Sequence, residues 1–185
     1  MIPAIFLDRD GVIIENRDNY VRSWDDVYIY PQALQALVRF SKLPFIYIIV
    51  TNQSVVGRNI ISKQEADAIN SRLVNEIKLA GGRIDAVFMC PHAPSAGCRC
   101  RKPNSGLFHQ AALTLSLNLN SSIMVGDALT DLVAAQVAGV KQRVLVRTGR
   151  GEEQSKLTEA LSLPSFSTYN TLLDAFSNLF QQTEL

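Results

Sequence analysis

Five short runs of apolar residues recur along the chain, and each has the length of a single strand. They occupy residues 2–7, 45–50, 84–89, 122–126 and 143–147, and they are rich in Ile, Val and aromatic residues. Because polar residues do not alternate with the apolar ones, the runs are typical of strands that are buried on both faces of a parallel sheet.

The segments between these runs have the spacing of amphipathic helices. One begins at Ser62, where Glu65 completes a capping-box pattern, and ends at the two glycines 81 and 82. Two more are predicted at about 107–117 and 127–139. Strands that alternate with helices predict right-handed crossovers, and therefore an α/β, Rossmann-like doubly wound parallel sheet with helices on both faces.

The length of 185 residues, without a recognisable linker, predicts a single domain spanning residues 1–185. After Gly149 the chain turns polar and then has a weak amphipathic pattern, so a C-terminal helical segment at about 152–182 is expected to dock on the sheet. Only 42 residues separate Asp8 from Thr51, and 50 separate Thr51 from Lys102. These intervals leave no room for a large cap domain.

Composition and charge exclude several kinds of partner. The formal net charge is +1, and 19% of the residues are charged, so there is no basic surface for a nucleic acid. The first apolar run is short and has no basic leader, which indicates neither a signal peptide nor a membrane span. We therefore expect a cytoplasmic monomer with no nucleic-acid or membrane partner.

Polar residues follow the strands at the edge where an open parallel sheet binds ligands. They are Asp8 and Asp10 after the first run, Thr51, Asn52 and Gln53 after the second, Arg101 and Lys102 in the loop after the third, and Asp127 after the fourth. Taken singly, each motif is more often a turn or a helix cap. Their ordered combination, one motif after each strand, is what indicates a functional site.

These side chains have the chemistry that phosphoryl transfer requires. The carboxylates of Asp8, Asp10 and Asp127 form an oxygen-rich set suited to Mg²⁺. Thr51, Asn52 and Lys102 can hold the phosphoryl oxygens and spread the charge of the transition state. Asp8 can attack phosphorus. Asp10, because it lies close to another carboxylate, is expected to keep a proton and to act as acid and then base.

All three cysteines of the chain lie in CPHAPSAGCRC, residues 90–100. With one histidine they form a Cys₃His set, made of Cys90, His92, Cys98 and Cys100, that matches a tetrahedral structural zinc site. Four protein ligands leave no open position for water, so this zinc-binding loop is not expected to be catalytic. The alternative is a group of unrelated buried thiols beside a surface histidine. Metal binding would supply folding energy that such a polar loop lacks.

The motifs FLDRDG, VTNQS, CRKP and VGDALTD resemble the four ordered motifs of the haloacid dehalogenase superfamily phosphatases. CPHAPSAGCRCRKP, TNQS and LVRTG are more specifically similar to the D-glycero-D-manno-heptose-1,7-bisphosphate phosphatase family, over about residues 3–151. Histidinol-phosphate phosphatases share the short zinc loop and are the nearest competing family.

The resemblance implies a Mg²⁺-dependent hydrolase that removes the C7 phosphate of heptose 1,7-bisphosphate through an aspartyl phosphate, in nucleotide-activated heptose biosynthesis. Asp8 would be the nucleophile and Asp10 the acid and base. Asp8, the backbone carbonyl of Asp10, and Asp127 would hold Mg²⁺, with Asp131 behind them. Arg101 would recognise the second phosphate. The implied substrate contacts are Asn16, Tyr20, Thr51, Asn52, Gln53, Ser54, Arg101, Lys102 and Ala128.

Three positions depart from the family pattern: Val12 replaces a threonine, Ala128 stands where some relatives carry a lysine, and SVVGRN replaces the usual SGxxRG.

Outside this family the strongest alternative is a phosphoacceptor receiver domain. Receivers carry the phosphorylated aspartate on a different strand from the acidic pair, whereas Asp8 and Asp10 follow the same strand. A zinc-stabilised interaction module with a dead site is disfavoured because every presumed catalytic position is filled. A nucleotide-binding enzyme is disfavoured because neither GxGxxG nor GxxxxGK occurs.

Overall fold

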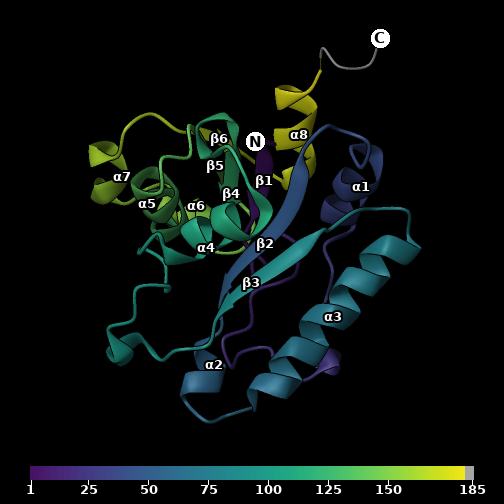
Figure 1. The fold of residues 1–185 in the computed structure, drawn as a ribbon, viewed down its shortest axis with the longest axis vertical. Helices are drawn as coiled ribbons and strands as arrows, with labels where there is room; N and C mark the ends of the chain where they lie inside the picture. Colours follow the sequence, from purple (N-terminus) through teal and green to yellow (C-terminus); the bar gives the residue numbers. More distant parts are fainter. Residues whose placement is uncertain (182–185) are drawn as a thin grey trace.

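The computed structural model describes residues 1–181, apart from the side chain of Leu161. Six parallel strands form one sheet in the order β3-β2-β1-β4-β5-β6 (Figure 1). The strands are β1 (Ala4–Leu7), β2 (Ile46–Asn52), β3 (Ala86–Cys90), β4 (Ile123–Gly126), β5 (Gln142–Val146) and β6 (Ser167–Tyr169). The helices are α1 (Pro31–Arg39), α2 (Ser54–Gly57), α3 (Lys63–Leu79), α4 (Gly106–Leu115), α5 (Leu129–Val137), α6 (Gly151–Gln154), α7 (Thr158–Ser162) and α8 (Leu172–Leu179).

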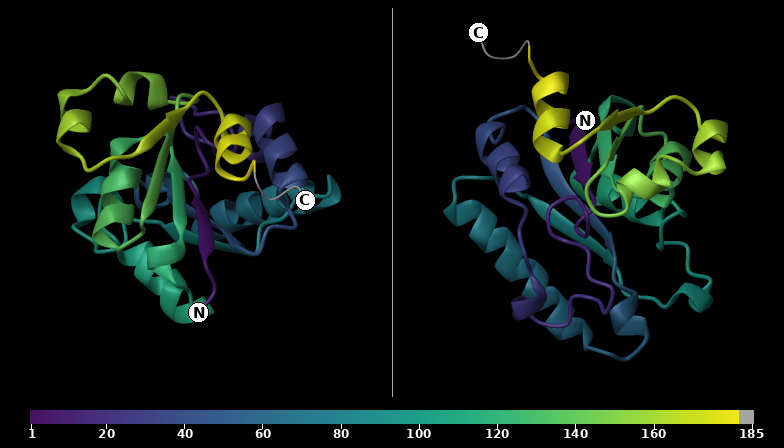
Figure 2. Two further views of the ribbon diagram at one scale, coloured as in Figure 1. Left: turned by 90° about the horizontal axis from the view of Figure 1, so that it is seen from above. Right: turned by 180° about the vertical axis from the view of Figure 1, so that it is seen from behind.

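Helices cover both faces of the sheet, and the alternation of side chains along each strand explains how. On β1, Ile5 and Leu7 pack in the core beneath α1, α3 and α8, whereas Ala4 and Phe6 pack in the core beneath α4 and α5. All four side chains are fully buried. The two layers of helices are visible on opposite sides of the sheet in Figures 1 and 2. The doubly wound fold predicted from the sequence is confirmed.

The five predicted strands all form, and no bound shifts by more than two residues. The predicted start of α3 is also confirmed: the Ser62 hydroxyl accepts a hydrogen bond from the Glu65 backbone N–H at 3.1 Å. The Glu65 carboxylate in turn accepts one from the Ser62 N–H at 2.7 Å. This reciprocal pair satisfies two backbone donors at the helix end.

The prediction of a C-terminal helical segment at about 152–182 is only partly correct, and residue 182 lies outside the described residues. The range contains most of α6 and all of α7 and α8, but also strand β6, which pairs in parallel with β5. The three residues of β6 do not form an apolar run, although Thr168 and Tyr169 suit a half-buried strand. Helix α8 does dock, against α1 and β6, and Phe176 stacks edge-on with Phe40.

The connections between strands within residues 1–181 consist of these helices and of loops, so the described chain has no separate cap domain. None of the helices formed by these residues combines the length and the apolar character needed to cross a bilayer. Since the described chain has no cap domain, the site at the carboxyl ends of the strands is lined by the segments that follow those strands.

Candidate active site

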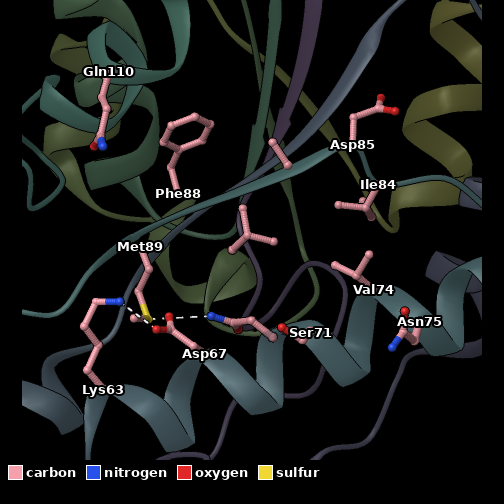
Figure 3. Close-up of a pocket in the computed structure, with 13 residues that line it drawn as sticks. Lys63, Asp67, Ser71, Val74, Asn75, Ile84, Asp85, Phe88, Met89 and Gln110 are labelled. Atoms are coloured by element: carbon pink, nitrogen blue, oxygen red, sulfur yellow. Dashed lines mark hydrogen bonds and ion pairs between the residues drawn. The ribbon is translucent and has the colours of Figure 1, made fainter. Parts of the chain in front are cut away.

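Two cavities lie at different edges of the sheet. The larger, of about 680 Å³, lies between α3 and the edge strand β3 (Figure 3). It is lined by apolar side chains of β3 and by an exposed pair between Lys63 and Asp67, and none of the acidic residues at the strand ends reaches it.

The smaller cavity, of about 430 Å³, lies at the carboxyl ends of the central strands. Its lining residues are Asp8, Asp10, Asn16, Arg17, Asp18, Tyr20, Val21, Asn52, Gln53, Ser54, Arg58, Pro94, Arg101, Lys102, Thr130, Asp131 and Arg150. Because it gathers the predicted acids and cations in one place, the smaller cavity is the candidate active site.

Lys102 is the cation at the centre of this cavity. Its ammonium group lies 2.8 Å from Asp8 Oδ1 and 2.7 Å from Asp131 Oδ1, and it donates to the carbonyl of Val50 at 2.8 Å. The side chain is 1% exposed. Burial lowers the pKa of Lys102, but Asp131 and Asp8 together outweigh it and the pKa is raised. The lysine is therefore charged at every physiological pH.

Asp8, Asp127 and Asp131 form a buried acidic cluster, in which one carboxylate oxygen from each lies within 4.8 Å of the others. Burial raises the pKa of all three carboxyl groups, and that of Asp8 rises to about 6 although Lys102 opposes the shift. Asp8 Oδ1 is held by Lys102 and by the Arg9 backbone N–H. Among the described residues, no hydrogen bond reaches Asp8 Oδ2, and Asp8 lines the cavity, so this oxygen is available to a ligand bound there.

Asp10 has different neighbours from those expected. Both of its carboxylate oxygens accept hydrogen bonds from the guanidinium of Arg9, at 3.1 and 3.0 Å, and Oδ2 accepts another from Gln53 at 2.9 Å. Arg9 is 1% exposed and also donates to the side chain of Asn70 on α3 at 2.8 Å. The hydrogen-bond partners of the Asp10 carboxylate are therefore donors, and a third one, the Thr51 hydroxyl, lies 3.5 Å from Oδ2.

Asp127 is fully buried at the end of β4 and is held by two loops. Its Oδ2 accepts hydrogen bonds from Asn16 at 2.8 Å and from the Arg150 backbone N–H at 2.9 Å. The Arg150 guanidinium reaches both oxygens, with its NH2 group 3.1 Å from Oδ1. A Cβ atom at Gly11 or at Gly149 would collide with this carboxylate, so both loops need glycine to pass so close.

The last two residues of β2 support the site in two ways. Thr51 is buried, and its hydroxyl accepts a hydrogen bond from Gln53 at 2.8 Å, beside Asp10. The side-chain amide of Asn52 instead brackets the backbone of Lys102: it donates to the carbonyl at 3.0 Å and accepts from the N–H at 3.1 Å. The side chain of Asn52 therefore holds the lysine segment in place.

The cysteine-rich loop brings its four predicted ligands together. The three sulfur atoms are 3.3, 3.5 and 3.6 Å apart, and His92 Nδ1 lies 3.2 Å from the sulfur of Cys100. Ligands at about 2.0–2.3 Å from a tetrahedral zinc are separated by about 3.5–3.8 Å. All three cysteines are free of disulfides, and the four donor atoms can hold one metal ion.

The thiols of this cluster differ in their proton affinity. Burial raises the pKa of Cys90 to about 12. Burial also acts to raise that of Cys98, but the Arg101 backbone N–H and the neighbouring thiols lower the pKa to about 7. A thiol that ionises near neutral pH binds a metal readily.

Arg101, directly after the last cysteine, has the only buried side-chain nitrogen in the described chain that lacks a hydrogen-bond partner. This NH1 atom belongs to a side chain that lines the smaller cavity. Arg17 and Arg58 also line it. An unsatisfied guanidinium nitrogen beside two further arginines is suited to an anionic ligand.

The structure places most of the predicted substrate contacts in the cavity: Asn16, Tyr20, Asn52, Gln53, Ser54, Arg101 and Lys102 all line it. Two do not. Thr51 lies beneath the lining residues, and Ala128 is buried at the start of α5, where its N–H donates to Asp131. Thr130 lines the cavity in its place.

No role was predicted from the sequence for Arg9, Asn70, Arg58, Thr130 or Arg150. Arg150 had a usable signal, because it lies four residues after the fifth strand, at the same edge of the sheet as the other strand-end residues. Arg9 lies between the two predicted aspartates. Asn70 gave no signal, since an asparagine on a helix is usually exposed to solvent.

Comparison with known proteins agrees with this geometry. Residues 99–175 match the family model described as HAD-hydrolase-like. The D-glycero-β-D-manno-heptose-1,7-bisphosphate 7-phosphatase of Bordetella bronchiseptica is 38% identical over 149 residues, which cover 80% of this chain and 83% of that protein. The enzyme of the same name from Photorhabdus laumondii is 36% identical over 157 residues, covering 80% of this chain and 82% of that protein.

A solved structure shows the same relationship. The crystal structure of the B. bronchiseptica D,D-heptose 1,7-bisphosphate phosphatase, complexed with magnesium and phosphate, superposes with a TM-score of 0.89 and 34% identity. The match covers 98% of this chain and 99% of that one. Fold, strand-end motifs and sequence identity over most of both chains together show that this chain belongs to the D-glycero-β-D-manno-heptose-1,7-bisphosphate 7-phosphatase family of HAD-like phosphatases.

Proposed function

We propose that the chain is a Mg²⁺-dependent phosphatase that removes the C7 phosphate of D-glycero-D-manno-heptose 1,7-bisphosphate, in the cytoplasmic biosynthesis of nucleotide-activated heptose. The observation that carries the proposal is the Asp8 carboxylate, which is fixed through Oδ1 by a buried lysine and open at Oδ2. A fixed carboxylate with one open oxygen at the end of a central strand is what attack on phosphorus requires.

In the first step, Asp8 Oδ2 attacks the phosphorus of the C7 phosphate, and the bond from phosphorus to the sugar oxygen breaks. Asp10 delivers a proton to that leaving oxygen. The positive charge of Lys102 and the backbone N–H groups after β2 stabilise the phosphoryl oxygens as charge builds on them. The products of this step are the sugar alcohol and an aspartyl phosphate on Asp8.

In the second step, Asp10 takes a proton from a water molecule, whose oxygen attacks the phosphorus of the aspartyl phosphate. The bond from phosphorus to Asp8 breaks, which releases inorganic phosphate and restores the carboxylate. The fork of hydrogen bonds from Arg9 holds Asp10 in one orientation for both proton transfers.

The donor set of the acidic cluster fits Mg²⁺. Three buried carboxylates, from Asp8, Asp127 and Asp131, face two cations, Lys102 and Arg150, which leaves the cluster short of positive charge. Asp8, Asp127 and the backbone carbonyl of Asp10 would hold the ion, and Asp131 would hold Lys102. Mg²⁺ bound there would neutralise charge on the transferred phosphoryl group.

The Cys₃His cluster fits a structural Zn²⁺, held by Cys90, His92, Cys98 and Cys100. Zn²⁺ bound there would lock the loop that leads into Arg101 and Lys102. The unpaired NH1 of Arg101 supports its role in binding the second phosphate of the substrate. A sugar carrying two phosphates matches a cavity wall that holds several arginines.

The test is a phosphate-release assay with zinc-loaded protein in Mg²⁺. The substrates are both anomers of heptose 1,7-bisphosphate, and histidinol phosphate, which has a single phosphate. We expect the bisphosphate to be hydrolysed and Asp8→Asn to abolish turnover. Asp67→Asn, an exposed carboxylate paired with Lys63, is the matched control and should leave turnover unchanged.

Arg101→Gln separates the two substrate classes. It should raise KM for the bisphosphate by about tenfold, because a charge-assisted contact to the second phosphate is lost, and it should affect histidinol phosphate less. Hydrolysis of histidinol phosphate alone would assign the chain to that activity. Release of phosphate from none of these substrates would refute the proposed function.

A further inference from the structure

Arg150 is a cation in the candidate site to which the reaction described above gives no role. It lies on the loop after β5, at the position where this loop crosses the acidic cluster. Its guanidinium donates to both carboxylate oxygens of Asp127, through Nε to Oδ2 at 3.3 Å and through NH2 to Oδ1 at 3.1 Å. The Arg150 side chain is 55% exposed, whereas Asp127 is fully buried.

The two oxygens of Asp127 are held in different ways. Oδ2 accepts hydrogen bonds from the side chain of Asn16 and from the backbone N–H of Arg150, and neither depends on the guanidinium. Among the described residues, the only partner of Oδ1 is the NH2 group of Arg150. A metal ion that binds Asp127 through Oδ1 would bring a second cation to an oxygen that already pairs with the guanidinium. Repulsion between the two cations then favours release of the guanidinium, while the carboxylate itself stays in position.

The backbone of this loop is fixed by its neighbours, whereas the side chain of Arg150 extends into solvent and has room to change conformation. The hydroxyl of Thr148 donates to the carbonyl of Gly11 at 2.6 Å, which ties the loop to the turn after β1. Gly149 packs directly against Asp127 and Gly11, with a φ of 59° that favours glycine. A displaced guanidinium can therefore swing about its own side-chain bonds without moving the loop.

The displaced guanidinium remains at the wall of the substrate cavity. Arg150 lines the 430 Å³ cavity together with Arg101 and Lys102. Once the carboxylate has a metal ion as its partner, the nearest new partner for the guanidinium is the anionic substrate in that cavity. A guanidinium binds phosphate oxygens through two parallel N–H donors, a geometry that fits this exchange.

Building on the function proposed above, we propose that Arg150 exchanges partners on metal binding: without the ion it pairs with Asp127, and with the ion it binds the phosphorylated substrate. The exchange couples the binding of the metal ion to the binding of substrate. Metal binding breaks the ion pair between Arg150 and Asp127, and substrate binding gives the guanidinium a new partner. Arg150 is thus a substrate-binding residue that becomes available only in the metal-loaded enzyme.

The first test measures Mg²⁺ binding to zinc-loaded protein by isothermal titration calorimetry, with no substrate present. Arg150→Gln should bind Mg²⁺ about threefold to fivefold more tightly than the wild type, since a partly exposed ion pair no longer competes. Arg147→Gln is the matched control, because Arg147 is a similarly exposed arginine that pairs with Glu152 outside the cavity. Unchanged or weaker Mg²⁺ binding by Arg150→Gln would overturn the exchange.

The second test measures kinetics on heptose 1,7-bisphosphate at saturating Mg²⁺. Arg150→Gln should raise KM by about tenfold, with a smaller change in kcat, as expected when a contact to bound substrate is lost. An unchanged KM would show that the released guanidinium does not reach the substrate. Failure of the wild type to bind Mg²⁺ at all would instead refute the proposed magnesium-dependent function, so the two failures are distinguishable.

Discussion

Lys102 shows how one buried side chain can organise a polar site. Its ammonium has three acceptors, namely Asp8, Asp131 and the carbonyl of Val50, which match its three N–H donors. An unpaired charge at this depth would be strongly destabilising, whereas a fully satisfied one is tolerated. Because Asn52 also brackets its backbone, Lys102 has little freedom to move. Its charge is thus fixed beside the proposed nucleophile.

At the same scale, Arg9 is predicted to position the proposed acid and base. Arg9→Met removes the two hydrogen bonds that orient the Asp10 carboxylate. We expect kcat on heptose 1,7-bisphosphate to fall by about 10- to 100-fold with little change in KM, because a small misplacement of a reacting group has a cost of that order. Steady-state kinetics check this prediction. Arg9→Lys keeps the positive charge but cannot donate two parallel hydrogen bonds, so its kcat should lie between those of Arg9→Met and the wild type.

The control for Arg9 is Arg72→Met. Arg72 is an arginine of α3 itself, and it stacks on Trp24 outside the cavity. A second variant, Asn70→Ala, removes only the outer partner of Arg9 and should lower kcat by a smaller factor. A wild-type kcat in folded Arg9→Met protein would show that Asp10 is oriented by Gln53 and Thr51 alone.

The residues that could be predicted from the sequence are those directly at a strand end. Asp8, Thr51 and Asp127 follow continuous apolar runs, so the edge of the sheet to which they belong is known in advance. Arg9 contacts Asn70, which is 61 positions away, and that contact depends on how α3 packs across the sheet. Local sequence patterns carry no information about such a pair.

The cysteine-rich loop, residues 90–100, has no large aliphatic or aromatic side chain of its own. It connects β3 to α4, and its exit is tied down by Asn104, whose side chain donates to the carbonyl of Cys98 at 2.9 Å and whose N–H donates to that of Arg101. The loop therefore presents Arg101 and Lys102 from one side, while Asn52 holds Lys102 from the other. Loss of the metal should weaken only the first of these supports.

Cys98→Ser is predicted to remove the zinc and loosen this loop. Elemental analysis should find about one zinc per chain in the wild type and none in the variant, since a four-ligand site binds one ion. The melting temperature should fall, and KM for the bisphosphate should rise more than kcat falls, because Asn52 still holds Lys102. Ser95→Ala, in the same loop but not a ligand, is the control. Full zinc content in Cys98→Ser would contradict the site.

Element prediction succeeded where local chemistry decides the structure. The capping box at Ser62 and Glu65 correctly marked the start of α3, because both partners lie within one turn. Strand β6 was missed because three residues show no periodicity, and the strand forms only because β5 offers it an open edge. No bounds were predicted for α1, which begins at Pro31, the residue best suited to a first helical position.

For the whole molecule, the strand order explains why the acids meet. β1 lies between β2 and β4, and the order of strands reverses at this point. Asp8 at the end of β1 and Asp127 at the end of β4 are therefore neighbours across the switch point, where open α/β sheets bind their ligands. Because several buried carboxyl groups meet there, the stability of the folded protein is expected to depend on their ionisation.

Without Mg²⁺, ionisation of the Asp8 carboxyl group is predicted to lower the stability of the folded protein, because burial disfavours the charged form. Burial raises its pKa from near 3.9 when unfolded to about 6, so its contribution is fully present below pH 4 and is lost as the pH rises through 6. Lys102 stays charged throughout and does not affect the dependence of the unfolding free energy on pH.

In magnesium-free buffer, the free energy of unfolding of the wild type, measured against Asp8→Asn, should therefore fall by up to about 3 kcal/mol between pH 4 and pH 7. Urea unfolding of zinc-loaded protein measures this difference, and adding Mg²⁺ at pH 7.5 should stabilise the wild type more than Asp8→Asn. A difference that is constant with pH would contradict the raised pKa of Asp8.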